Sequence, residues 1–515
     1  MTSLSDEALK LITEMKHLNE ELEGSHESVS INFEQATVLK QLAKLAKEKE
    51  QRRVLMEWQH IRESINWMWW FADSNLGASD TYLDISDPWE FVCGVARLTG
   101  NLAAGCPNNQ NWIAKECEPA MRFILHHVTS WDYAESTEDN TLPRLIAQCL
   151  TNVVTGNEET SKQIWSTYTR LPERDNVVTR LLQHKDRQTV MVTLIFILNI
   201  LSTTPNQSLA MAKGEGGRAI CCSLLEMVDR TSEDEQKEDI FQYLFSIFTR
   251  LFEDGALASL YKMLQSADGT ISPHQITLLK VLDGYTHSDP KALNGNPSIS
   301  AFLSDTLVTL LQTTKSCATI DPDSEAGFTP DENLPQVSAL TVLVSQALAN
   351  ALMAEQTAWE TSHDKETLGR PVLNKLRDPS SSFIELIIDV LRRLDQLLPR
   401  IQFGKAKPVV TGTDIPSANQ ASLPASRFQF QKRDLVRLLG ILIHDDPSVQ
   451  ARVREIGGVQ LILGLCAIDE SNPFIREHAL FALRNLLYKN PENQRIVQEM
   501  EPMGKIDESG VLTGI

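Results

Sequence analysis

Four asparagines stand near the ends of apolar segments, at positions from which they could hold a peptide main chain. They are Asn101, Asn152, Asn199 and Asn485, and the first three recur at intervals of 51 and 47 residues. A carboxamide offers hydrogen-bond donors and an acceptor, so it can pair with a peptide group. The same asparagines could instead bond neighbouring helix ends within the protein. No ladder of regularly spaced tryptophans accompanies them, which counts against peptide binding.

A second candidate surface lies on the segment 473–488, which predicts a helix with two stripes at about 100° per residue. One stripe comprises Phe474, His478, Phe481 and Asn485, at i, i+4, i+7 and i+11. The other is apolar and comprises Ile475, Ala479, Ala482, Leu483 and Leu486. One stripe is predicted to pack within its repeat, and the other to line a concave surface or meet the next repeat. We interpret His478 as a buried histidine rather than a ligand-binding one.

The helices that carry these residues share an end signature. In residues 101–110 and again in 485–494, Asn-Leu is followed by Pro six residues after Asn and by Asn-Gln at eight and nine. Helix-end signatures that recur so far apart indicate a repeat array. Such arrays usually bind other proteins.

The repeat length defines the expected architecture. Pro447 and Pro491 lie 44 residues apart, and Gly-Gly at 457–458 opens a short apolar segment between them. Strand signals are weak throughout. A period of about 40–47 residues with two or three helices is typical of armadillo and HEAT repeats. The sequence therefore predicts an all-α, right-handed armadillo/HEAT-like solenoid, in one lobe or two.

Composition limits the classes of partner. The 515 residues carry a formal charge of −20, which argues against nucleic-acid binding and against attraction to an anionic membrane. No uncharged apolar stretch was expected to reach about 18 residues, so no membrane insertion is predicted. Eight scattered cysteines and an N-terminus without a secretory pattern predict reduced thiols and a cytoplasmic location.

The sequence divides into four segments. Residues 1–88 form a helical capping region, 89–402 hold repeats with an acidic loop near 316–336, 403–426 form a Pro/Ser-rich linker, and 427–515 form a C-terminal armadillo domain. Two helical blocks are expected between the acidic loop and the linker, at residues 334–359 and 383–398.

The capping region carries a basic and aromatic surface. Lysines surround an apolar face near residue 42, and tryptophans follow between 58 and 70. We interpret this region as the solvated end layer that a repeat stack requires. The alternative is a docking surface; its residues are Lys40, Lys44, Lys47 and Lys49 with Trp58, Trp67, Trp69 and Trp70.

The sequence offers no recognisable catalytic or metal-binding pattern. It has no Gly-x-x-x-x-Gly-Lys-Ser/Thr loop, no His-Glu-x-x-His helix and no Gly-x-Ser-x-Gly elbow. The glycine-rich segment 214–217 lacks the preceding strand of a dinucleotide site. We therefore predict a protein that is not an enzyme and uses no cofactor or metal.

The C-terminal segment from about residue 433 resembles the ataxin-10 family. The resemblance rests on Gly-Gly at 457–458, on residues 469–479 (Asp-Glu-Ser-Asn-Pro-Phe-Ile-Arg-Glu-His-Ala), and on Arg-Asn-Leu at 484–486 with the residues to 494. It implies an all-α armadillo protein of the cytoplasm with a non-enzymatic role in cytokinesis. The acidic and Pro-rich central insertions are typical of a fungal-type member. Ile441 departs from the repeat, because it occupies the position that Asn485 holds one repeat later.

These observations predict a scaffold that binds partner proteins of unknown identity and acts in cell division. The sequence leaves open whether the chain forms a homo-oligomer. One alternative is a cargo or peptide adaptor with an asparagine-lined groove. The other is a metal-handling protein, since some fungal relatives carry a copper-transport name, but the chain lacks Met-x-x-Met, Cys-x-Cys and Cys-x-x-Cys.

Overall fold

A computed structural model shows the fold. It describes residues 10–17, 33–76, 86–130, 140–231, 238–288, 296–317, 334–362, 369–398, 400–402, 405–407, 428, 430–499, 505–506 and 512–513.

The chain forms two compact units, Met1–Leu264 (unit 1) and Gln265–Ile515 (unit 2). The four segments expected from the sequence stay predictions. Most of the expected acidic loop (318–333) and of the linker (403–404 and 408–426) lies outside the described residues.

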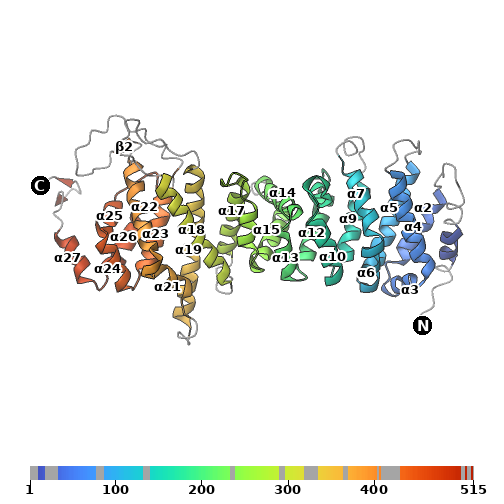
Figure 1. Cartoon of the computed structure of the whole chain (residues 1–515), viewed down its shortest axis with the longest axis horizontal. Coiled ribbons are helices and arrows are strands. Elements are labelled where there is room, and N and C mark those ends of the chain that lie inside the picture. The colour runs from blue at the N-terminus through green and yellow to red at the C-terminus, as the bar shows by residue number, and fades with distance from the viewer. Residues whose placement is uncertain are drawn as a thin grey trace. The chain divides into compact units, whose positions relative to one another are not determined.

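Unit 1 consists of helices stacked in chain order (Figure 1). They are a short helix at residues 10–17, α2 (Phe33–Leu45), α3 (Lys49–Glu57), α4 (Gln59–Leu76), α5 (Ser86–Ala103), α6 (Pro107–Glu116), α7 (Glu118–Val128), α9 (Thr141–Val154), α10 (Glu158–Tyr168), the 3-10 turn η1 (Glu173–Asp175), α11 (Val177–Leu182), α12 (Arg187–Leu201), α13 (Pro205–Met211), α14 (Glu215–Thr231), α15 (Glu238–Glu253) and α16 (Leu257–Met263).

Unit 2 is also helical, with two very short antiparallel hairpins. Its elements are α17 (Pro273–Ser288), α18 (Pro297–Cys317), α19 (Leu334–Thr361), α21 (Pro371–Arg377), η4 (Pro379–Ser381), α22 (Phe383–Leu397), β1 (Arg400–Gln402), β2 (Lys405–Lys407), α23 (Gln431–Ile443), α24 (Pro447–Glu455), α25 (Gly458–Leu465), α26 (Ile475–Leu487), α27 (Pro491–Glu499), β3 (Lys505–Ile506) and β4 (Leu512–Thr513). The helical blocks expected at 334–359 and 383–398 are confirmed as α19 and α22.

The long helices of each unit pack in series. In unit 1, α2 contacts α5, α5 contacts α9, α9 contacts α12 and α12 contacts α15; in unit 2, α19 contacts α23 and α23 contacts α26. Other helices of varied length lie between them in the chain. This serial stacking of similar helical units confirms the all-α, armadillo/HEAT-like solenoid.

The recurring sequence signature has a local cause. Pro107, Pro205 and Pro491 each begin a short helix, where a missing N–H costs nothing because the first amides of a helix have no intrahelical partner. Four residues after the asparagine, the chain turns through the left-handed region, at Gly105 (φ 67°) and Lys489 (φ 53°). The signature therefore encodes the sharp corner between a long helix and the following short one.

Helix α26 bears out the two-stripe prediction in part, because the helix begins at Ile475 and Phe474 lies just before it in the left-handed region (φ 66°). Of the apolar stripe, Leu483 is half-buried and the other four side chains are buried. On the second stripe, Phe474 and Phe481 are 68% and 43% exposed, His478 is half-buried and Asn485 is buried. The helix packs through one stripe and presents aromatic side chains on the other.

Helix α19 differs from the expectation about membrane segments. Its 28 residues include an 18-residue window with a mean hydropathy of 1.6, which is long and apolar enough to cross a membrane. The helices α12 and α13 together pass the same test, with a bend of 119° between them. In α19, 61% of the window is buried inside the protein, against α17, α18 and α23. Burial on several sides accounts for its apolar composition, as in a core helix.

The capping region has a packed core and an exposed aromatic rim. Trp69 is fully buried, and its indole N–H donates to Thr99 Oγ1 at 3.1 Å. Trp67 stacks on Phe71 with ring centroids 5.1 Å apart. Trp70 is 60% exposed. The interior agrees with a capping layer, and the docking alternative stays a prediction.

The glycine-rich segment that opens α14 is a close-packing device. A Cβ on Gly217 would lie 2.1 Å from the carbonyl oxygen of Met211, and one on Gly214 would lie 2.2 Å from that of Thr169. The glycines are therefore needed because backbone approaches backbone here, and not because a phosphate binds.

We expect Gly217→Ala to lower the free energy of unfolding by roughly 2 kcal/mol, because the backbone must shift to admit the methyl group. Urea unfolding of the full chain measures it. Gly464→Ala is the control: its Cβ meets only Arg400 Nη2 at 3.7 Å. If both variants retain wild-type stability, close packing is not the reason for the glycine.

Candidate functional site

The residues proposed to bind partners do not form one site. Phe474 and Asn485 line none of the hollows described here. The others lie in three places: Asn101 and Asn152 in one hollow of unit 1, Asn199 in another, and His478 with Phe481 in a groove of unit 2.

All four asparagines use an amide N–H within the protein. Each bond joins the asparagine to the preceding long helix or its end, so the contacts fit the scaffold interpretation for that N–H. A carboxamide has a second N–H and an oxygen, so a role in partner binding stays a prediction. The bonds run from Nδ2 of Asn101 to Ala43 O (2.7 Å), of Asn152 to Gly100 O (2.9 Å), of Asn199 to Thr155 Oγ1 (2.8 Å) and of Asn485 to Gly440 O (2.9 Å).

In two of the repeats, a glutamine on the short helix also bonds to the end of the neighbouring long helix, a role that sequence reasoning missed. Gln450 Nε2 donates to the carbonyl oxygens of Asn485 (2.8 Å) and Tyr488 (3.3 Å), and its Oε1 accepts from Asn490 Nδ2 (3.0 Å). Gln110 makes the same three bonds in unit 1. Carbonyls at helix C-termini lack intrahelical partners, so the glutamine satisfies them. Its signal in the sequence is Pro-x-x-Gln at the start of α6, α24 and α27.

The groove of unit 2 is the better formed candidate for partner binding. It has a volume of about 330 Å³, and its lining combines apolar side chains with two arginines. Met353 and Phe481 are 49% and 43% exposed there. Four helices contribute its lining: α19 (Met353, Gln356, Thr357), α21 (Leu373, Arg377), α23 (Arg437, Ile441, His444) and α26 (His478, Phe481).

Ile441 explains why this groove is apolar. It stands where the repeat places an asparagine in α26, and it lines the groove beside Phe481. At this departure from the repeat pattern, an apolar side chain thus replaces a polar one in the groove lining. An aliphatic side chain among an aromatic and a thioether favours an apolar ligand group.

Two arginines are held in place at the groove. Arg377 is buried and donates to the carbonyls of Leu442 (2.9 Å) and His444 (2.7 Å), at the C-terminus of α23. Burial lowers the pKa of this guanidinium despite nearby carboxylates. Arg437 Nη2 donates to Asn350 Oδ1 at 3.1 Å and lies 3.8 Å from Met353 Sδ. Arg377 therefore serves the scaffold, whereas Arg437 lies beside the exposed apolar surface.

His478 is more accessible than a core histidine. It is half-buried and lines the groove. Burial lowers its pKa, and the positive charges of Arg437 and Arg433 lower it further. The imidazole is therefore neutral at pH 7 and offers both a donor and an acceptor to a bound partner.

The helices α23 and α26, which supply half of the groove, belong to a recognisable domain. The family model for the spinocerebellar ataxia type 10 protein domain matches residues 431–514. Similar proteins include the ataxin-10 homologs of Candida albicans (39% identical) and Saccharomyces cerevisiae (33%) and the ataxin-10 of Xenopus tropicalis (34%).

Residues 431–514 thus match the ataxin-10 domain.

The similarity covers only a small part of each chain. The three relatives match over 16%, 18% and 24% of this chain and over 18%, 17% and 24% of their own length, respectively. Because fungal and animal proteins match alike, the fungal type stays a prediction. Similar solved structures include an engineered protein (15% identical, TM-score 0.35, covering 92% of this chain and 98% of its own) and the designed armadillo repeat protein YIII(Dq)4CqI (14%, TM-score 0.33, 53% and 98%).

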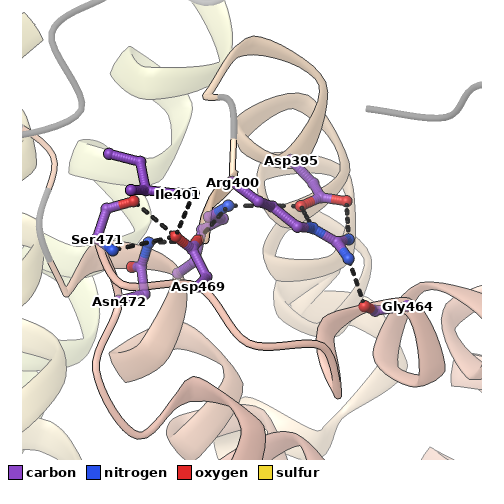
Figure 2. A network of polar contacts seen from close by, with 8 residues as sticks. Asp395, Arg400, Ile401, Gly464, Asp469, Ser471 and Asn472 are labelled. Carbon is purple, nitrogen blue, oxygen red and sulfur yellow. Dashed lines mark hydrogen bonds and ion pairs between the residues drawn. The ribbon is translucent and has the colours of Figure 1, made fainter. Parts of the chain in front are cut away.

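A buried ion network ties the ataxin-10 domain to the chain before it (Figure 2). The side chain of Lys432 is fully buried, and its Nζ lies 3.0 Å from Asp469 Oδ2 and 3.4 Å from Asp395 Oδ1. Arg400 also pairs with Asp395, at 2.8 Å. The lysine is thereby the centre of a network that spans α22, β1, α23 and the loop before α26.

Asp469 organises the loop that precedes α26. Its carboxylate accepts the Ile401 N–H (3.3 Å), the Ser471 hydroxyl (2.6 Å) and the Asn472 amide (3.0 Å), as Figure 2 shows. Burial alone would raise its pKa, but Lys432 and these donors together hold the pKa of Asp469 below the usual value. The family-specific segment that begins at Asp469 thus has a structural role at its first residue.

Burial makes three of the cysteines poor nucleophiles. Burial raises the pKa of Cys149 and Cys221 far above the usual value, and raises that of Cys222 to about 11. A protonated thiol is a poor nucleophile and a poor metal ligand. Among the described residues, no group of three or more His, Cys, Asp or Glu side chains is placed to hold a metal ion.

Proposed function

We propose that this chain is a non-enzymatic, armadillo-type scaffold that binds a partner protein in the groove of unit 2. The observation that carries the proposal is the exposed pair Met353 and Phe481 beside Arg437, a residue combination enriched at protein interfaces. The groove is partly built from the ataxin-10 domain, which links it to the segment shared with relatives.

The cellular role is proposed from the ataxin-10 resemblance. It favours the regulation of cytokinesis, with the protein in the cytoplasm. The absence of catalytic sequence motifs supports a role through binding, and the raised pKa values of the buried Cys149 and Cys221 thiols agree with it.

We expect the double variant Met353→Ala/Phe481→Ala to reduce recovery of the partner at least about tenfold, because exposed anchors contribute to binding more than to folding. Affinity capture from dividing cells, quantified by mass spectrometry, measures the recovery, and rescue of a cytokinesis defect measures the consequence. Thermal unfolding should change little.

The matched control is Phe123→Ala/Ile468→Ala. These side chains are 54% and 52% exposed and lie outside the groove lining. The control should recover the partner like the wild type. Equal recovery by both double variants would show that the groove of unit 2 is not the binding surface.

A second candidate function is a peptide adaptor, favoured by the hollow of unit 1. Asn101 and Asn152 both line it, and three long helices contribute to its lining. This function does not require the groove of unit 2.

A further inference from the structure

The hollow of unit 1 is built from three long helices that pack in series, α2, α5 and α9. Its volume is about 290 Å³. On α9 the lining positions are spaced i, i+3, i+4 and i+7, and on α5 they are spaced i, i+1, i+4 and i+5, so the residues of each helix share one side of it. The lining residues are Lys40, Ala43 and Lys44 on α2 and Lys47 in the turn after it; Ala96, Arg97, Gly100 and Asn101 on α5; and Leu145, Gln148, Cys149 and Asn152 on α9.

The charge of this hollow opposes that of the chain. Four lining side chains are cationic and none is a carboxylate, although the chain carries a formal charge of −20. Lys40 forms an ion pair with Glu90. Within the described part of the chain, no ion pair involves Lys44, Lys47 or Arg97. The positive field of these three is therefore available to an anionic ligand.

The lining of the hollow includes two side-chain amide groups in fixed positions. The bonds from Asn101 to Ala43 and from Asn152 to Gly100 hold the two carboxamides in one orientation. An amide that is already oriented can pair with a peptide group without losing further side-chain freedom. Amide groups and cations in the same lining suit a ligand with a peptide backbone and acidic side chains.

We propose that this hollow, the Lys44–Lys47–Arg97 groove, is a docking site for an extended acidic peptide segment of a partner protein. The inference rests on the proposed protein-binding function and adds a partner chemistry to it. Packed helices lie about 8–10 Å apart and an extended chain advances about 3.3 Å per residue, so three helices match roughly six residues.

Charge complementarity favours a peptide over a nucleic acid. A nucleic acid carries a charge at every phosphate and needs a long basic track. The lining has four cations in one place, on a chain with net negative charge that repels a polyanion elsewhere. A short acidic segment requires only this local field.

The test uses the full chain and a labelled peptide of about nine residues with alternating Glu and Ala, followed by fluorescence anisotropy. We expect saturable binding that weakens as salt rises above about 0.1 M. Lys44→Glu/Lys47→Glu should raise Kd at least about tenfold. Both lysines are exposed, so the fold should persist, as thermal unfolding would verify.

The matched control is Lys213→Glu/Lys262→Glu, which makes the same charge change at exposed positions outside the hollow. It should change Kd less than about twofold. The proposal is overturned if the wild type binds no acidic peptide, if both double variants weaken binding equally, or if a short oligonucleotide binds more tightly. The groove variant Met353→Ala/Phe481→Ala should bind the peptide normally, which separates this proposal from the function of unit 2.

Discussion

Lys432→Met is expected to lower the free energy of unfolding of the chain by about 4 kcal/mol, because it leaves a buried carboxylate without its cation. Methionine approximates the length of the lysine side chain, so lost packing contributes little. Among the described residues, the buried Asp469 has Lys432 as its one cationic partner, whereas Asp395 keeps Arg400 at 2.8 Å. The loss should therefore appear mainly at Asp469 and in the loop before α26.

The pH dependence provides a second readout of this network. The pKa of Asp469 in the folded protein lies below its usual value. A depressed carboxyl pKa stabilises the fold above the unfolded pKa, and this contribution is lost as pH falls through the folded pKa. In the Lys432→Met variant we expect the acid-induced loss of stability to begin at a higher pH, because the pKa of Asp469 is no longer held down.

Urea unfolding of the full chain, together with hydrogen exchange of the α23 and α26 amides, measures both effects. The control is Lys375→Met, whose ion pair with Asp305 at 3.1 Å is exposed. Exposed pairs contribute about 0–1 kcal/mol, so this variant should stay close to the wild type. Similar losses in both lysine variants would contradict a special role for the buried network.

Gln450→Leu is expected to lower the free energy of unfolding by about 3 kcal/mol. Gln450 is 2% exposed and its amide serves two carbonyls, those of Asn485 and Tyr488. It also accepts from Asn490. Each buried polar group left without a partner costs about 1–3 kcal/mol, and leucine satisfies none of the three.

Gln494→Leu is the matched control, since Gln494 holds the equivalent position one repeat later. Its amide donates to Leu487 O at 2.8 Å in an exposed setting. The expected change is within about 0.5 kcal/mol. Urea unfolding compares the two glutamine variants. A loss of the same size at both positions would show that the Gln450 bonds do not stabilise the contact between repeats.

The sequence determined the local architecture because its signals act over a few residues. Proline fixes the start of α6, α13 and α27, the residue four positions after Asn101 or Asn485 turns the corner, and the 3.6-residue period separates the buried stripe of α26 from Phe481. The motif beginning at Asp469 likewise indicated the ataxin-10 domain. Each inference needed only neighbours along the chain.

Only the tertiary structure decided where these side chains meet. The groove combines Met353 with Phe481, which lie far apart in the sequence, and the buried network joins Asp395 to Lys432 and Asp469. The tertiary structure also decided which groups the asparagines bond to, since Nδ2 of Asn152 donates to Gly100 O on the preceding long helix. Periodicity determines which face of a helix is apolar, but the neighbour that the face meets depends on how the repeats stack, and that is set by long-range contacts.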